Sequence, residues 1–229
     1  MLETCDRVHQ TRILIQARMS SSRYPGKVLA PLQGTPLIGH LVSRIFKVRP
    51  AEEVIVLTSV EKSDDPLVEY LKFLGVQTFR GPLDNVFRRF QLCLEKFECK
   101  WFFRISADSP LFKADLINKM LSYSQSNEFD IVTNIFPRSF PKGHSLEMVR
   151  SKVFENIDSS GLTSDQKEHV TKVYYDNYHE YSIKNIHSGN VDMMEMNLCV
   201  DTIEDLNRLN SQDLREFSGT SDKSFRENC

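Results

Sequence analysis

Residues 12–27 read RILIQARMSSSRYPGK, a short apolar run followed by a long polar loop. The run at 12–17 is rich in β-branched and aliphatic side chains, which predicts a buried strand. The loop carries many hydroxyl groups and three cations, Arg18, Arg23 and Lys27. The P-loop pattern G-x-x-x-x-G-K-[ST] fails, because the residue after Lys27 is valine, and G-x-G-x-x-G is absent. The loop is therefore either a solvated basic segment or a phosphate site of another design.

Apolar runs and amphipathic stretches alternate after this loop, which predicts an α/β fold with a mostly parallel sheet and helices on both faces. The run WFFRIS at 101–106 is the most hydrophobic, so we expect it at the centre of the sheet. We expect Thr35 to cap a helix that begins at Pro36, Asp84 to cap a later helix, and Gly75 to end one. The other expected strands are 53–59, 76–80, 130–134, 145–150, 181–187 and 197–200, and the other expected helices are 64–74, 113–126, 164–179 and 202–210.

The composition excludes several classes of protein. The chain has 229 residues, with 29 basic and 31 acidic side chains and a formal net charge of −2. This near-neutral balance disfavours non-specific nucleic-acid binding, and no apolar run approaches the roughly 18–20 residues that a membrane span needs. The polar first ten residues are unlike a secretory signal, and the odd number of cysteines favours a reduced, cytoplasmic protein. We expect one domain over 1–216, with a smaller substrate lobe within about 135–195, and a flexible tail at 217–229.

Two aspartates follow predicted strands, at the edge where open α/β sheets bind ligands. Asp108 comes directly after the strand at 101–106, where a lone acid is often a turn or cap residue. Asp201 lies between the last predicted strand and a helix that opens at Thr202, where it could equally be an N-cap. Local sequence alone leaves both alternatives open.

The string QARMSSSRYPGKVL at 16–29, with GTPLIGHLVSRI at 34–45, resembles the opening signature of the cytidylyltransferases that activate acidic sugars. These include the acylneuraminate and 3-deoxy-manno-octulosonate cytidylyltransferases, and the likeness is greatest to the spore-coat polysaccharide biosynthesis branch. The family pattern A-R-x-x-S-x-R-x-P-G-K ahead of G-x-P-L is matched at nearly every fixed position. The resemblance implies a three-layer fold of the nucleotide-diphospho-sugar transferase type.

The resemblance also implies roles for individual residues. In the family this loop wraps the triphosphate of CTP, and two aspartates in the strings G-D-x-P-L and V-D-T-x-E-D-L hold a divalent metal. This chain has Ala107 where the first string has glycine. Two carboxylates with phosphate oxygens and water suit Mg²⁺. The implied nucleotide-binding residues are Gln16, Ala17, Arg18, Ser22, Arg23, Lys27 and Asn85, with Arg18, Lys27 and Asp108 catalytic and Asp108 and Asp201 on the metal.

The sugar side is implied by two further strings. The segment 133–147 fits a P-x-G-x-x-x-E string of the family, although Ser145 replaces an aspartate that is frequent in the spore-coat branch. The motif E-H-V-T at 168–171 matches that branch, although a histidine at such a helix edge is often a packing residue. The implied substrate residues are Arg138, Lys142, Glu147 and His169.

The expected reaction transfers CMP from CTP to an acidic or keto sugar of the nonulosonic or octulosonic type and releases pyrophosphate. Its expected partners are CTP, the sugar, Mg²⁺ and a second copy of the chain, in surface polysaccharide or glycoconjugate biosynthesis. Two alternatives stay open. A glycosyltransferase of the same fold usually holds its metal with D-x-D, but the site here reads Ser106-Ala107-Asp108. A non-catalytic nucleotide-binding subunit would have no need of both aspartates and the full cationic loop.

Overall fold

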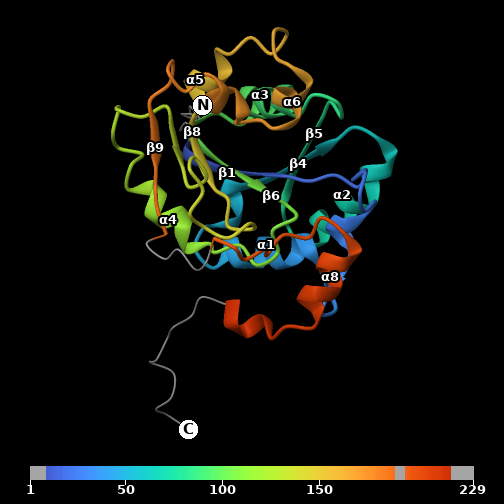
Figure 1. The fold of residues 1–229 in the computed structure, drawn as a ribbon. Helices are drawn as coiled ribbons and strands as arrows, with labels where there is room; N and C mark the ends of the chain where they lie inside the picture. The colour runs from blue at the N-terminus through green and yellow to red at the C-terminus, as the bar shows by residue number, and fades with distance from the viewer. Residues whose placement is uncertain (1–8, 189–193, 218–229) are drawn as a thin grey trace, which may run out of the picture.

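The computed structural model describes residues 9–188 and 194–217, which form a seven-stranded sheet between two layers of helices (Figure 1). The strand order is β5-β4-β1-β6-β8-β7-β9, so the WFFRIS strand is central, as predicted. The strands are β1 (His9–Gln16), β4 (Val54–Ser59), β5 (Gln77–Gly81), β6 (Cys99–Ser106), β7 (Ile131–Thr133), β8 (Glu147–Arg150) and β9 (Ile183–Asn185).

The sheet is mostly parallel. Strand β1 pairs in parallel with both β4 and β6, and Ile15 lies opposite Val56 and Ile105. Strand β8 is the exception, because it runs antiparallel to β6 and to β7. The carboxyl ends of β1, β4, β5 and β6 therefore meet at one edge, and their following loops can form one site.

Side chains alternate between the two faces of each strand, which gives two separate cores. From β1, Ile13 and Ile15 enter the core beneath α1, α2 and α4, whereas Leu14 enters the core beneath α3, α5 and α7. The helices are α1 (Leu37–Phe46), α2 (Asp65–Phe73), α3 (Val86–Lys96), α4 (Asp115–Leu121), α5 (Ser151–Glu155), α6 (Ser164–Glu168), α7 (Lys172–Asp176) and α8 (Ile203–Asn210).

A small third cluster attaches α8 to the rest of the molecule. Leu206 and Leu209 of α8 pack with Leu32, which belongs to the short hairpin of β2 (Pro31–Leu32) and β3 (Thr35–Pro36). This packing holds the segment just before α8 close to the loop after β1. Within the described ranges, no helix has the length and apolar character needed to cross a bilayer.

Two predicted helix caps are wrong. Thr35 pairs with Leu32 in the hairpin, so α1 begins only at Leu37. At α3 the cap is Asn85 rather than Asp84, because the Asn85 side chain accepts a hydrogen bond of 2.8 Å from the backbone N–H of Arg88. Gly75 does follow the end of α2, with a φ of 69° that favours glycine.

Other element boundaries also differ from prediction. The expected helix at 164–179 is two helices, because His169 leaves the helical region with ψ of 76° and Val170 turns into the core. The expected strand at 197–200 makes only an isolated bridge, from Asn197 to Lys142. The helix expected at 113–126 spans only Asp115–Leu121. The expected tail lies outside the described residues from 218 onward, and the substrate lobe stays a prediction.

The buried side chain of His144 makes the free energy of unfolding depend on pH. Burial is the main cause that lowers its pKa from 6.5 to about 4. The unfolded chain takes up a proton below about pH 6.5 while the folded chain does not until about pH 4. The free energy of unfolding should therefore fall by about 3 kcal/mol over that window.

Urea unfolding of the wild type and His144→Gln at pH 7 and pH 4 measures this effect. The wild type should lose more stability than the variant between the two pH values. An equal loss in the two proteins would show that folding does not lower the pKa of His144.

Candidate functional site

The loop after β1 folds so that Lys27 points inward. Gly26 has a φ of 75°, which glycine adopts without strain, and its N–H donates to the carbonyl of Met19 at 2.7 Å. A single turn of 3-10 helix then starts at Lys27, whose residue surface is only 9% exposed. The Pro-Gly-Lys string thus places a buried ammonium group at the carboxyl edge of the sheet.

Lys27 lies between the two aspartates that the sequence singled out. Its Nζ is 2.9 Å from Asp201 Oδ1 and 3.4 Å from Asp108 Oδ2. The two acids are held together by the backbone, because the Val200 N–H donates to the Asp108 carbonyl at 2.9 Å. Asp201 is not the cap of α8; Thr202 is, in a capping box with Asp205.

The donor set around Lys27 fits Mg²⁺. Both carboxylates face one cationic position, and carboxylate oxygens are the ligands this ion prefers. Among the described residues, no group of three or more His, Cys, Asp or Glu side chains converges on a point. The described residues thus offer two carboxylates, and a Mg²⁺ ion held there would take its other ligands from water and phosphate.

The two arginines of the loop also face carboxylates. Arg23 Nη2 lies 3.1 Å from Asp201 Oδ1, and Arg18 Nη2 lies 2.7 Å from Glu168 Oε1. Glu168 is the last residue of α6, so the break before α7 is what presents it to the loop. The three cations assigned to phosphate are thus all neutralised by acids in this structure.

Asp64 holds the loop in place, a role that the sequence does not predict, because its pattern indicates only the start of a helix there. Its carboxylate is fully buried and accepts hydrogen bonds from the Met19 N–H at 2.7 Å, the Thr58 hydroxyl at 2.7 Å and the Ser59 N–H at 2.8 Å. Burial raises the pKa of Asp64, but these bonds, with that of the Ser59 hydroxyl, outweigh it and lower the pKa below its ordinary value. The signal was its place just after a buried strand.

Arg89 is a second residue that sequence reasoning missed. It is 1% exposed, and its guanidinium donates to the Pro82 carbonyl at 2.9 and 2.6 Å and to the Leu83 carbonyl at 3.1 Å. Burial lowers its pKa to about 10, so it is still charged at neutral pH. Arg89 therefore fixes the loop between β5 and α3 where that loop meets the site.

A buried acid lies below the site. Glu147 is fully buried on β8 and accepts hydrogen bonds from Thr171 Oγ1 at 2.8 Å and Tyr175 Oη at 3.3 Å. Arg104 of β6 reaches the other carboxylate oxygen through Nη1 at 3.3 Å. Burial, together with the charge of Glu147, raises the pKa of Tyr175 well above its usual value, so the phenol stays protonated and donates.

These residues surround a cleft of about 560 Å³ at the carboxyl edge of the sheet. It receives side chains from the loop after β1, the end of β6, the start of α3, the end of α6 and the segment before α8. Its lining includes Gln16, Ala17, Arg18, Ser22, Arg23, Lys27, Val86, Arg89, Arg104, Ser106, Asp108, Ser145, Glu168, His169, Cys199 and Asp201.

Four sequence-predicted site residues do not line this cleft. Asn85 uses its side-chain oxygen to cap α3. Arg138 donates to the Ser145 hydroxyl at 3.0 Å, and Lys142 is exposed where its backbone bridges to Asn197. Glu147 is buried beneath the floor. His169 does line the cleft, and its side chain is 63% exposed, so it is not a packing residue.

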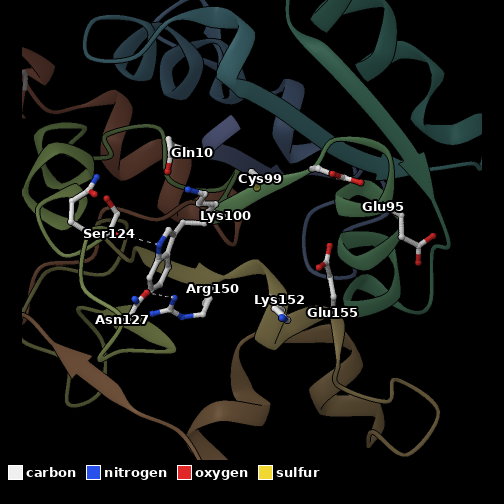
Figure 2. A pocket seen from close by; sticks show the side chains of 12 residues that line it. Gln10, Glu95, Cys99, Lys100, Ser124, Asn127, Arg150, Lys152 and Glu155 are labelled. Atoms are coloured by element: carbon white, nitrogen blue, oxygen red, sulfur yellow. Dashed lines mark hydrogen bonds between the residues drawn. The ribbon is translucent and has the colours of Figure 1, made fainter. Parts of the chain in front are cut away.

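A larger hollow of about 780 Å³ lies at the opposite end of β6 (Figure 2). Its wall is held by internal contacts: the Arg150 guanidinium lies 4.5 Å from the Trp101 ring centre, and Trp101 Nε1 donates to the Ser124 carbonyl at 3.0 Å. Glu155 in its lining has a pKa raised by burial and by the charges of two other glutamates. Three glutamates, Glu95, Glu98 and Glu155, line this hollow and would repel a phosphate group, so we place the site at the carboxyl edge.

The comparisons with known proteins agree with this geometry. The sequence profile of a family described as cytidylyltransferase matches residues 12–219. An uncharacterised protein of Methanocaldococcus jannaschii is 31% identical over 84% of this chain and 78% of its own length. The spore coat polysaccharide biosynthesis protein SpsF of Bacillus subtilis is 30% identical over 69% of this chain and 67% of its own length.

Solved structures show the same fold. A cytidylyltransferase from Leptospira borgpetersenii superposes with a TM-score of 0.84 at 26% identity, over 91% of this chain and 92% of that one. A CMP:2-keto-3-deoxy-manno-octonic acid synthetase complexed with CTP superposes with a TM-score of 0.67 at 18% identity, over 88% and 97%. The predicted fold class, a mostly parallel α/β nucleotidyltransferase sheet, is confirmed.

Proposed function

The chain belongs to the cytidylyltransferase family, as its phosphate-loop signature predicted, and on that premise we propose that it transfers CMP from CTP to an acidic or keto sugar. The sugar class is the octulosonic or nonulosonic type, and pyrophosphate is released. The observation that carries the proposal is the position of Lys27 between Asp108 and Asp201, in a cleft that the two arginines of the same loop also line. A triphosphate needs such a cluster of positive charge.

The loop after β1 accounts for the binding of CTP. Arg18, Arg23 and Lys27 supply forked and point charges to the phosphate oxygens, and the backbone N–H groups of the loop add hydrogen bonds. The sugar hydroxyl attacks the α-phosphorus and gives up its proton to water, a new oxygen–phosphorus bond forms, and the bond to the bridging oxygen breaks as pyrophosphate leaves. Charge on the departing pyrophosphate is neutralised by the cations of the loop.

Asp108 and Asp201 are the residues that would hold Mg²⁺. The ion supplies a positive charge that lowers the cost of the negative charge building up on the transferred phosphoryl group. The same two carboxylates neutralise Lys27 and Arg23 in this structure. If the two carboxylates held this ion, Lys27 and Arg23 would be free to bind phosphate oxygens.

The polar side chains that line the cleft support a polar acceptor. Ser106, Ser145 and His169 bring hydroxyl and imidazole groups to the cleft beside the phosphate loop. Sugar hydroxyls are bound by such groups. The name of the Bacillus subtilis relative supports a place in polysaccharide biosynthesis, while a homodimer and a cytoplasmic location stay predictions.

The proposal is tested by pyrophosphate release from each nucleoside triphosphate with Mg²⁺ and a panel of nonulosonic and octulosonic acids. We expect release with CTP and at least one sugar acid, and none without the sugar. Release of nucleoside diphosphate from a nucleotide-sugar would identify a glycosyltransferase instead. Stoichiometric CTP binding with no turnover on any acid would identify a binding subunit. Either result would overturn the proposal.

A further inference from the structure

Five cationic side chains from the described residues line the cleft, and four of them already have an assigned role. Arg18, Arg23 and Lys27 come from the phosphate loop, and Arg89 is committed to the carbonyls of the loop between β5 and α3. Arg104 is the fifth. It comes from β6, on the sheet floor, so it is not part of the phosphate loop.

Arg104 is held from two sides. Its Nε donates to Gln16 Oε1 at 3.0 Å, and its Nη1 donates to Glu147 Oε2 at 3.3 Å. Its side chain is 13% exposed and lines the cleft. Guanidinium carries five N–H donors, and these two bonds use two of them. Its Nη2 has no partner among the residues described.

The ion pair between Arg104 and Glu147 is held in place, because other side chains fix Glu147. Glu147 accepts from Thr171 and Tyr175, and the Tyr175 hydroxyl is also 2.9 Å from Thr133 Oγ1. A buried ion pair gives little net stability compared with an apolar pair of similar volume. A purely structural reason for burying Glu147 under a cleft-lining arginine is therefore weak.

The cations first expected on the sugar side are not available in the cleft. Arg138 and Lys142 do not line it, whereas Arg104 does, next to Ser106 on the same strand end. Ser145 and His169 line the same cleft and bring a hydroxyl and an imidazole group to it. A guanidinium presents its donors in a rigid fork that matches the geometry of a carboxylate.

We propose that Arg104 binds the carboxylate of the acceptor sugar through its free N–H donors and that Glu147 is the positioning residue that orients it. The inference rests on the proposed function and narrows its acceptor to sugars with a free carboxylate, such as 2-keto sugar acids. A neutral keto sugar would leave the guanidinium facing the cleft without an anion.

Steady-state pyrophosphate release tests the proposal with the sugar acid that the wild type uses and with its carboxamide. For Arg104→Gln we expect the KM for the acid to rise about 30-fold, because a charge-assisted hydrogen bond is lost. The KM for CTP should stay within about threefold, since the phosphate loop is unchanged. The ratio of kcat/KM for the acid to kcat/KM for the amide should fall in Arg104→Gln by about the same factor as the KM for the acid rises.

Two further variants make the result specific. Arg150→Lys, an arginine on β8 that lies over Trp101 at the far end of the sheet, is the matched control and should leave all constants unchanged. Glu147→Gln keeps the shape of the side chain and should raise the KM for the acid about tenfold, because Arg104 loses its charged tether. It also provides the readout if Arg104→Gln fails to fold.

The outcomes separate this inference from the function it rests on. A wild type that turns over no sugar acid overturns the proposed function. If the wild type is active, an unchanged KM for the acid in Arg104→Gln would overturn only the role of Arg104. An equal loss of activity on acid and amide in that variant would do the same. Equal effects of Glu147→Gln on acid and amide would overturn the positioning role.

Discussion

Replacing Asp108 by Asn is expected to lower kcat for CMP transfer about 10³-fold, or ~4 kcal/mol in the barrier. The carboxylate lies 3.4 Å from Lys27 Nζ and faces the same point as Asp201. Asparagine keeps the shape and an oxygen acceptor but removes the negative charge that a divalent ion requires. Initial rates of pyrophosphate release at saturating CTP measure the effect.

The control for this variant is Asp115→Asn, an exposed acid in the first turn of α4. It should retain the wild-type rate. The free energy of unfolding of Asp108→Asn should stay within about 1 kcal/mol of the wild type, because Lys27 keeps its closer partner, Asp201 at 2.9 Å. Near-wild-type turnover by Asp108→Asn would remove this residue from the catalytic site, and Asp201→Asn is expected to behave as Asp108→Asn does.

Replacing Lys27 by Met is expected to lower kcat/KM for CTP about 10³-fold. The ammonium group is nearly buried at the carboxyl edge of β1 and is the cation of the loop that contacts both aspartates. Methionine keeps most of the length and apolar body of the side chain but cannot neutralise phosphate. Both the affinity for CTP and the rate of transfer should fall, because the charge acts on bound nucleotide and on departing pyrophosphate.

The matched control is Lys119→Met, an exposed lysine on α4. It should leave kcat/KM unchanged, which shows that loss of one positive charge on the protein surface is not the cause. Equal small losses in Lys27→Met and Lys119→Met would mean that Lys27 only neutralises the two acids and does not act on the nucleotide.

Local patterns predicted much of the architecture. The most hydrophobic run became the central strand β6, and the Pro-Gly-Lys string turned Lys27 toward Asp108 and Asp201. These features depend on short segments: a run of apolar residues specifies burial, and a glycine permits positive φ. The edge of a parallel sheet then brings together residues that are distant in the chain.

The errors arose where tertiary contacts outweigh local preference. Thr35 was expected to cap a helix but is used by a hairpin, and the helix at 164–179 breaks because Val170 is drawn into the core. The resemblance implies that Glu147 contacts the substrate, yet the strand register places it beneath the cleft. There it contacts Arg104, which lines the cleft. Side-chain direction on β6 and β8 cannot be read without the pairing of those strands.

The central claim is that Asp108 and Asp201 form one cation site shared with the triphosphate of CTP. Calorimetric titration of CTP into the wild type and Asp108→Asn, each with Mg²⁺ and with EDTA, tests it most directly. The claim predicts that Mg²⁺ tightens CTP binding at least about tenfold in the wild type and less than about twofold in the variant. The same Mg²⁺-dependent gain in both proteins would contradict it.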